Sequence, residues 1–112
     1  MKATTYVCNF VAQFAEDNWD KVDTEYVEIK QSKTEFIKVL KTNIDTAIWF
    51  LAEVMNWGMD KNYFNELCVD TLEEYDFYVL KLNDKYVKLT YTFSESDVEF
   101  TEPKEKTIIY FE

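Results

Sequence analysis

The sequence predicts an α+β fold, in which an antiparallel sheet carries helices packed on one of its faces. Three observations support this prediction. Residues 33–57 repeat apolar side chains at a helical period, whereas the last third of the chain alternates apolar and polar residues as half-buried strands do. Apolar residues make up 47% of the 112 positions, which is enough for one packed core. We therefore expect residues 1–112 to form a single globular domain.

The chain is predicted to begin with two strands, over residues 4–14 and 26–31. The first of these segments is also compatible with a helix. Its apolar stretch loosely imitates a signal peptide, but Asn9 and Gln13 interrupt it. We therefore expect the segment to belong to the fold of a cytoplasmic protein.

The clearest helix is predicted for residues 33–57. Ser32, with Glu35 three positions later, is typical of a capping box, and Gly58 stands where a helix ends. The weak helix formers around Asn43 allow a break there. About half of the helix circumference is apolar, which requires a broad cover such as a sheet. This apolar face comprises Phe36, Ile37, Val39, Leu40, Ile44, Ala47, Ile48, Phe50, Leu51, Val54, Met55 and Trp57.

Trp49 is the apolar exception on this helix, because it falls on the polar side with Lys38, Lys41 and Asp45. One interpretation is that other elements of the fold cover its ring. The other is that the ring anchors a partner or a self-association surface. Trp49 is therefore a candidate anchor residue.

A short second helix is predicted after Gly58, with Asp60 as its N-cap. Its apolar face comprises Tyr63, Phe64, Leu67 and Cys68. We expect this helix to pack on the same face of the sheet as the longer one.

The C-terminal third predicts a meander of four strands. Strands over residues 75–82 and 85–93 flank a two-residue loop, which pairs Tyr78 with Leu89 and Leu80 with Val87. A second loop at residues 95–96 pairs Phe93 with Val98 and Tyr91 with Phe100. A last strand over residues 107–111 follows a turn at residues 102–105. The predicted order is strand, strand, helix, short helix and four-stranded meander.

The outer face of this sheet is predicted to be both aromatic and acidic. Glu95, Asp97 and Glu99 alternate on one strand, so their carboxylates project to one side about 6.7 Å apart. That interval is comparable to the distance between successive phosphates along one nucleic-acid strand. Alternatively, these acids only prevent a sheet edge from pairing with another chain. The remaining outer-face residues are Phe77, Val79, Lys81, Tyr86, Lys88, Thr90, Thr92, Ile108 and Tyr110.

The composition excludes most familiar catalytic centres. The chain contains no histidine and no arginine, which removes histidine-based relays and bidentate phosphate clamps. A single glycine excludes the glycine-rich phosphate loops. Cys8 and Cys68 are 60 positions apart, so two reduced thiols are expected rather than a metal site, with a disulfide as the alternative. We predict no cofactor and no bound metal.

Carboxylate chemistry is the only catalytic alternative that remains. A glycosidase-like pair can be drawn from Asp70, Glu73, Glu74 and Asp76, a segment that also resembles a cation loop without its glycine. Nuclease-like Asp/Glu/Lys patterns occur at Asp97, Glu102 and Lys104 and at Asp23, Glu28 and Lys30. Charged residues make up 30% of the chain, so such matches are expected by chance. We therefore predict a protein that is not an enzyme.

The net charge of −10 indicates the kind of partner. Nucleic acids and anionic membranes require a positive surface, so direct binding to either is not expected. A negative field favours a basic protein partner and speeds encounter with it. The alternative is that the charge only keeps an aromatic-rich protein soluble.

In size and charge the chain is similar to small, very acidic phage-encoded inhibitors of host defence, including anti-CRISPR and other DNA-mimic proteins. Bacterial immunity proteins that neutralise basic nucleases share these properties. The similarity is one of composition and specifies no site. We predict a binding protein that sequesters a basic, nucleic-acid-binding partner, with a homo-oligomeric structural or adaptor protein as the alternative. The candidate binding residues are Glu95, Asp97, Glu99 and Glu102, supported by Glu73, Glu74 and Asp76, with Tyr86, Tyr110 and Trp49 as aromatic anchors.

Overall fold

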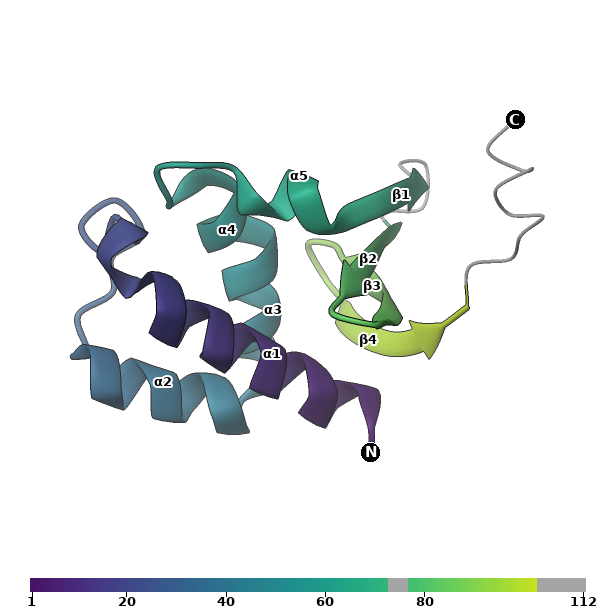
Figure 1. Cartoon of the computed structure of the whole chain (residues 1–112), viewed down its shortest axis with the longest axis horizontal. Helices are drawn as coiled ribbons and strands as arrows, with labels where there is room; N and C mark the ends of the chain where they lie inside the picture. Colours follow the sequence, from purple (N-terminus) through teal and green to yellow (C-terminus); the bar gives the residue numbers. More distant parts are fainter. Residues whose placement is uncertain (73–76, 103–112) are drawn as a thin grey trace.

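A helical layer and a four-stranded antiparallel sheet lie side by side in the computed structural model, which describes residues 1–72 and 77–102 (Figure 1). The predicted α+β class, with helices on one face of an antiparallel sheet, is confirmed. In chain order the helical elements are α1 (Ala3–Asn18), η1 (Trp19–Lys21), α2 (Lys33–Thr42), α3 (Ile44–Trp49), η2 (Phe50–Val54), α4 (Met55–Trp57) and α5 (Tyr63–Leu67). The strands are β1 (Cys68–Leu72), β2 (Phe77–Leu82), β3 (Lys85–Tyr91) and β4 (Ser96–Thr101). None of the helices in the described chain has both the length and the apolar character needed to cross a membrane.

The N-terminal segment is the helix α1, so the prediction of a strand there is wrong and the helical alternative is confirmed. Val7, Val11 and Ala15 recur four residues apart and are fully buried, as one face of a helix requires. This packing outweighs the weak helix propensity of the threonine and valine residues. The Tyr6 hydroxyl donates a hydrogen bond to the Leu82 carbonyl at 2.8 Å, which ties α1 to the end of β2.

Residues 26–31 form no strand, which contradicts the second predicted element. The backbone turns here because Asp23 Oδ1 accepts a hydrogen bond from the Tyr26 N–H at 3.0 Å. The Ile29 N–H then donates to the Thr24 carbonyl at 2.9 Å. Glu28 has a φ of 52°, which an extended strand cannot accommodate.

The predicted helix over residues 33–57 is interrupted at Asn43, as the sequence allowed. Asn43 has extended backbone angles, and its side-chain oxygen caps α3 by accepting from the Thr46 N–H at 3.0 Å. The capping box at the start of α2 is confirmed in both directions: Glu35 N–H donates to the Ser32 hydroxyl and Ser32 N–H donates to the Glu35 carboxylate. Side-chain hydrogen bonds to nearby backbone N–H groups therefore fix the start of α2 and the break between α2 and α3.

The capping box gives a pH-dependent contribution to stability. The pKa of Glu35 is lowered because its carboxylate accepts the hydrogen bond from the Ser32 backbone, with the Ser32 side chain and Lys38 acting in the same direction. A lowered folded-state pKa stabilises the fold above the unfolded-state pKa, and this contribution is lost as the pH falls through the folded value. The difference in unfolding free energy between the wild type and Glu35→Gln should therefore be present at pH 7 and vanish in acid. Urea titrations across this pH range measure it, and a difference that stays constant with pH would contradict the assignment.

Gly58 ends the helix as predicted, but not for the reason expected. Its φ is −95°, which other residues adopt readily, so no left-handed conformation demands glycine here. Glycine is needed because a Cβ atom at this position would clash with Cγ1 of Val27 and lie 3.3 Å from the Val54 backbone.

Gly58→Ala is expected to lower the free energy of unfolding by roughly 1–3 kcal/mol, the usual cost of overpacking. Val27→Ala should relieve part of this loss, because it removes the methyl group that clashes. A double-mutant cycle in urea measures the coupling. Additive losses in the double variant would show that the clash is not the cause.

Helix α5 begins one residue after Asn62, whose side-chain oxygen accepts from the Asn65 N–H at 3.2 Å. The N-cap is therefore Asn62, and the prediction of Asp60 is wrong. Phe64 is buried and packs edge to face with Tyr78 of β2, with 5.3 Å between ring centroids. The predicted packing of this helix on the sheet is confirmed.

The first predicted hairpin is confirmed in register, with Tyr78 opposite Leu89 and Leu80 opposite Val87. Asn83 in its loop has a φ of 62°, which asparagine tolerates. The strand before it, β1, was not predicted: Cys68 begins this strand instead of ending a helix. The strand predicted over residues 107–111 lies outside the described residues.

The register of the second hairpin differs from the prediction. Val98 lies opposite Leu89 and Phe100 opposite Val87, a shift of four residues. The cause is a longer turn, in which the Thr92 N–H donates to the Glu95 carbonyl at 2.7 Å and the Thr92 hydroxyl accepts from the Glu95 N–H at 2.9 Å. Because the shift is an even number of residues, each side chain keeps its predicted face.

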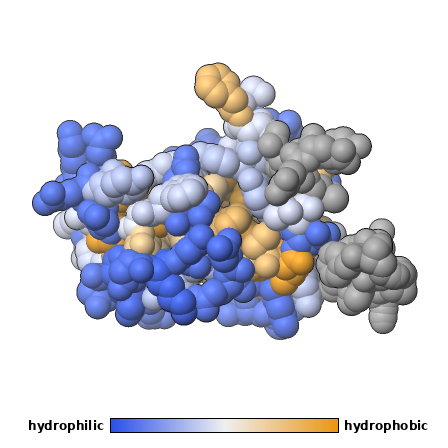
Figure 2. Space-filling model, turned by 90° about the horizontal axis from the view of Figure 1, so that it is seen from above, coloured by the Kyte–Doolittle hydropathy of each residue, from blue (hydrophilic) through white to orange (hydrophobic). Residues whose placement is uncertain are grey.

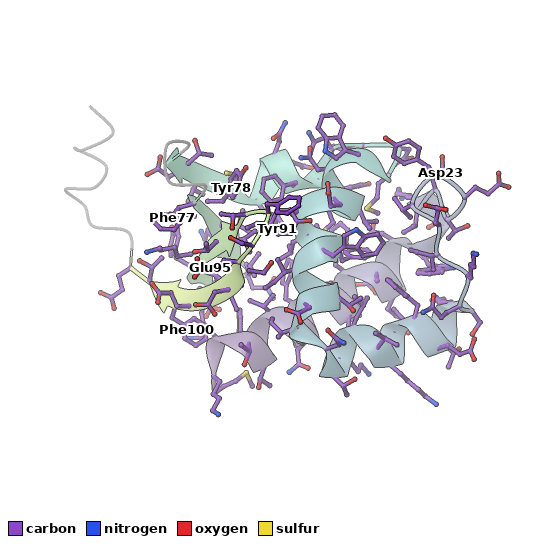
Figure 3. All side chains as sticks on the ribbon, turned by 180° about the vertical axis from the view of Figure 1, so that it is seen from behind. Asp23, Phe77, Tyr78, Tyr91, Glu95 and Phe100 are labelled. Atoms are coloured by element: carbon purple, nitrogen blue, oxygen red, sulfur yellow. The ribbon has the colours of Figure 1, made fainter. Side chains whose placement is uncertain are left out.

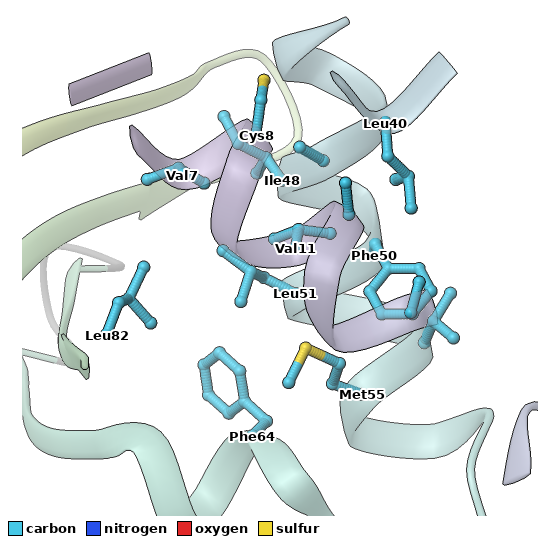
Figure 4. Close-up of a cluster of buried hydrophobic side chains, with 14 of the residues drawn as sticks. Val7, Cys8, Val11, Leu40, Ile48, Phe50, Leu51, Met55, Phe64 and Leu82 are labelled. Carbon is cyan, nitrogen blue, oxygen red and sulfur yellow. The ribbon is translucent and has the colours of Figure 1, made fainter. Parts of the chain in front are cut away.

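One hydrophobic core joins the two layers (Figure 4). Val11, Leu51 and Met55 contribute from the helices and Leu82 from the sheet, and all four are fully buried. Cys8 is buried in this core and Cys68 lies half-buried, and both are free thiols, as expected. Burial raises the pKa of each thiol, which disfavours the reactive thiolate.

Candidate partner-binding surfaces

The predicted acidic residues on β4 are exposed and project from the face of the sheet that the helices leave open. Asp97 lies opposite Thr90, and Glu99 lies opposite Lys88. Alternate residues of a strand share a face, so the two carboxylates project together about 6.7 Å apart. The strand order is β1-β2-β3-β4, which makes β4 an edge of the described sheet. Asp97 and Glu99 are therefore accessible from the face and from the edge.

Glu95 and Glu102 flank this pair, and we call the four residues the acid row. Glu95 lies in the turn before β4 and not on the strand, which corrects the prediction that it alternates with Asp97 and Glu99. Glu102 directly follows the strand, and both side chains are exposed. Figure 3 places Glu95 beside the sheet, together with Phe77 and Phe100. The acid row thus brings four carboxylates into eight consecutive positions.

Lysines and aromatic rings occupy the open face next to the acid row. The Lys88 ammonium lies 4.2 Å from the centre of the Phe77 ring and 3.5 Å from the Glu99 carboxylate. The Lys81 ammonium lies 5.8 Å from the centre of the Tyr86 ring. Among the described residues the predicted mixture of outward aromatics and charges is confirmed, with the Phe77 and Tyr86 rings half-buried beneath lysine side chains. Negative charge is therefore concentrated along the β4 edge.

The predicted anchor Trp49 lies in the helical layer and not on the acid row. Trp49 is half-buried in α3 and packs edge to face with Phe36, with 6.4 Å between ring centroids, so its ring belongs to the helical layer. Glu73, Glu74, Asp76 and Tyr110 lie outside the described residues.

A second charged surface lies at the opposite end of the molecule. Figure 3 shows Asp23 at one end and Phe77 and Phe100 at the other. A hollow of about 300 Å³ opens here between the segment after α1 and the segment after α4. We call it the acidic hollow, and its lining residues are Asp20, Lys21, Val22, Asp23, Trp57, Met59 and Asp60.

Backbone contacts build the acidic hollow from two distant segments. Val22 and Met59 form an isolated β-bridge. The Asp23 N–H donates to the Gly58 carbonyl at 2.7 Å, and the Asp60 N–H donates to the Lys21 carbonyl at 3.4 Å. The three aspartates therefore project from an ordered backbone.

The acidic hollow was not predicted from the sequence. Residues 16–28 carry six carboxylates and one lysine, but the three lysines of residues 1–31 reduced the charge of the whole segment to −3. A shorter charge window would have found the cluster. The helical period places Trp57 on the apolar face of the predicted helix, yet 66% of its surface is exposed. Only the pairing of Val22 with Met59 shows that this ring lies beside the aspartates.

An apolar groove of about 470 Å³ runs along α1. Tyr6, Phe10, Phe14 and Leu67 supply its apolar lining, and Phe10 and Phe14 stack with 6.4 Å between ring centroids. Figure 2 shows hydrophobic residues gathered in patches on an otherwise hydrophilic surface. The groove along α1 therefore exposes apolar side chains to solvent.

Within residues 1–72 and 77–102, no group of three or more carboxylates or thiols is arranged to hold a metal ion. The nuclease-like patterns at Asp23 and Asp97 therefore do not converge into a metal centre among the described residues. Comparisons with protein-family models, with curated proteins and with solved structures found no match for the chain.

Proposed function

We propose that this protein is a non-enzymatic binding protein, which sequesters a basic, nucleic-acid-binding protein by occupying its positive groove. The observation that carries the proposal is the acid row, in which Asp97 and Glu99 are exposed on one face of an edge strand at an interval close to that of nucleic-acid phosphates. A protein groove that binds a phosphate backbone presents lysine and arginine side chains at matching intervals. The acid row offers these side chains carboxylates in place of phosphates.

Two further properties support the proposal. The net charge of −10 steers a basic partner towards this protein and raises the association rate. The aromatic rings of Phe77 and Tyr86 lie beside the acid row on the same face and add apolar area to a contact. We expect no cofactor and no direct contact with nucleic acid or membrane.

Affinity capture tests the proposal. The tagged protein is incubated with a bacterial lysate, washed in rising salt, and the eluted proteins are identified by mass spectrometry. We expect a basic nucleic-acid-binding protein that elutes as the salt concentration rises, because salt screens exposed charges. Recovery of the tagged protein alone would contradict the proposal.

Self-association is the second candidate function, and exposed apolar side chains favour it. Phe93 is fully exposed in the turn before β4, and Phe100 is 39% exposed on β4. Burial of these rings against another copy would be insensitive to salt. Light scattering over a range of protein concentrations distinguishes the two: a mass that rises with concentration in high salt favours self-association, and a constant monomer mass excludes it.

A further inference from the structure

We propose that the acidic hollow is a second docking surface, which takes a lysine- or arginine-rich segment of a partner protein. The proposal does not depend on the acid row, because the two surfaces lie at opposite ends of the molecule (Figure 3). If both operate, the protein is bivalent for basic partners. Each surface can therefore be tested while the other is intact.

Exposed aromatic side chains mark this end as a contact surface. Trp57 lines the acidic hollow with 66% of its surface exposed, and Tyr26 is 65% exposed. The Tyr26 backbone N–H is bonded to the Asp23 carboxylate, which keeps this residue close to the hollow. Large aromatic residues usually bury most of their surface, and exposed ones are the side chains that most often anchor interfaces.

The backbone of the acidic hollow is ordered before any partner arrives. The Val22–Met59 bridge and the hydrogen bond between Asp23 and Gly58 hold the two segments together, and the Asp23 side chain caps the following turn. Less conformational entropy is lost when a partner binds to such a surface than to a flexible loop.

The charge of the acidic hollow determines the chemistry of its occupant. Asp20, Asp23 and Asp60 face a single lysine in the lining, and none of the three forms an ion pair with a described residue. The surrounding residues 16–28 add four more carboxylates. An anionic or purely apolar partner would be repelled or poorly solvated here, whereas a cationic side chain is complementary.

The combination of an indole ring with carboxylates in one lining favours a guanidinium or ammonium group. A cation placed over a tryptophan ring gains a cation–π interaction while its N–H groups bond to carboxylates. The hollow of about 300 Å³ is at the small end of ligand sites, so it suits individual side chains of a segment.

A titration followed by NMR tests the proposal, with hexa-arginine as the probe and hexa-glutamine as the uncharged control. The ¹⁵N-labelled full chain gives indole N–H signals from its three tryptophans, and Trp57→Phe assigns the relevant one. We expect hexa-arginine to shift the Trp57 indole signal and the amide signals of Asp20, Asp23 and Asp60. We expect no such shift with hexa-glutamine.

Matched variants locate the binding. Asp20→Asn with Asp60→Asn should weaken the affinity reported by Trp57 about fivefold, since each exposed charge pair contributes up to roughly 1 kcal/mol. Asp97→Asn with Glu99→Gln changes the net charge equally on the acid row and should leave that affinity nearly unchanged. The amide spectra of both double variants are first compared with that of the wild type, to confirm that each variant has the native fold.

Two results would overturn the inference: a Trp57 signal that hexa-arginine does not move, or equal weakening by the two double variants. Amide signals from Asp97 and Glu99 report on the acid row in the same spectra. The same spectra therefore distinguish a lack of binding at the acidic hollow from a lack of binding at the acid row, on which the proposed function rests.

Discussion

Asp97→Lys with Glu99→Lys is expected to abolish capture of the basic partner while leaving the thermal unfolding temperature within a few degrees of the wild type. The double change reverses the two charges that we propose to face the partner, so two attractive contacts would become repulsive. The cost to the fold is small because both side chains are exposed, and among the described residues the one ion pair lost is the partly exposed contact of Glu99 with Lys88. Such pairs contribute about 0–1 kcal/mol.

A second reversal controls for net charge. Asp17→Lys with Asp45→Lys changes the charge by the same amount at exposed positions of α1 and α3. Capture should survive in this control apart from a moderate loss of long-range steering. Capture and salt elution are compared for the three proteins, and unchanged capture by the acid-row variant would rule out this surface.

Phe50→Ala is expected to cause the largest loss of stability of any single change considered, about 3–5 kcal/mol. Phe50 is fully buried in η2, and its ring lies 6.1 Å from that of Phe36. Its removal leaves a cavity at the centre of the helical layer. Since small domains are stable by only about 5–15 kcal/mol, the variant should be marginally folded at room temperature.

Phe93→Ala is the matched control, because it deletes the same atoms from a fully exposed position. It should change the free energy of unfolding by no more than about 0.5 kcal/mol. Urea unfolding followed by circular dichroism measures both variants. Similar losses in the two would contradict the placement of Phe50 in the core.

Elements defined by local side-chain chemistry were predicted correctly from the sequence. Ser32 and Glu35 cap α2 by bonding each other's backbone, and Asn43 separates α2 from α3. Asn83 adopts the positive φ that its two-residue loop needs, which fixes the register of the first hairpin. In each case the deciding atoms lie within three or four residues of one another.

Elements decided by tertiary contacts were not predictable in this way. Helix α1 is stabilised by burial of Val7 and Val11 between other elements, against the propensities of its own residues. The shifted register of β4 depends on how the Thr92 side chain closes its turn. Strand β1 becomes a strand only by pairing with β2.

The acid row could be predicted from the sequence and the acidic hollow could not, because only the first depends on a local pattern. The composition of the open sheet face was predictable, because the alternation of side chains survives an even shift in register. The acidic hollow joins Asp23 to Trp57 and Asp60 across more than thirty residues of sequence, through the Val22–Met59 bridge. No local pattern indicates that contact.

Competition between this protein and DNA for the captured partner tests whether the acid row occupies the partner's DNA-binding groove. Fluorescent duplex DNA is bound to the purified partner, and this protein is added while fluorescence anisotropy is recorded. We expect the wild type to displace the DNA and the Asp97→Lys, Glu99→Lys variant to leave it bound. A ternary complex, in which partner, DNA and this protein bind together with undiminished affinity, would contradict this expectation.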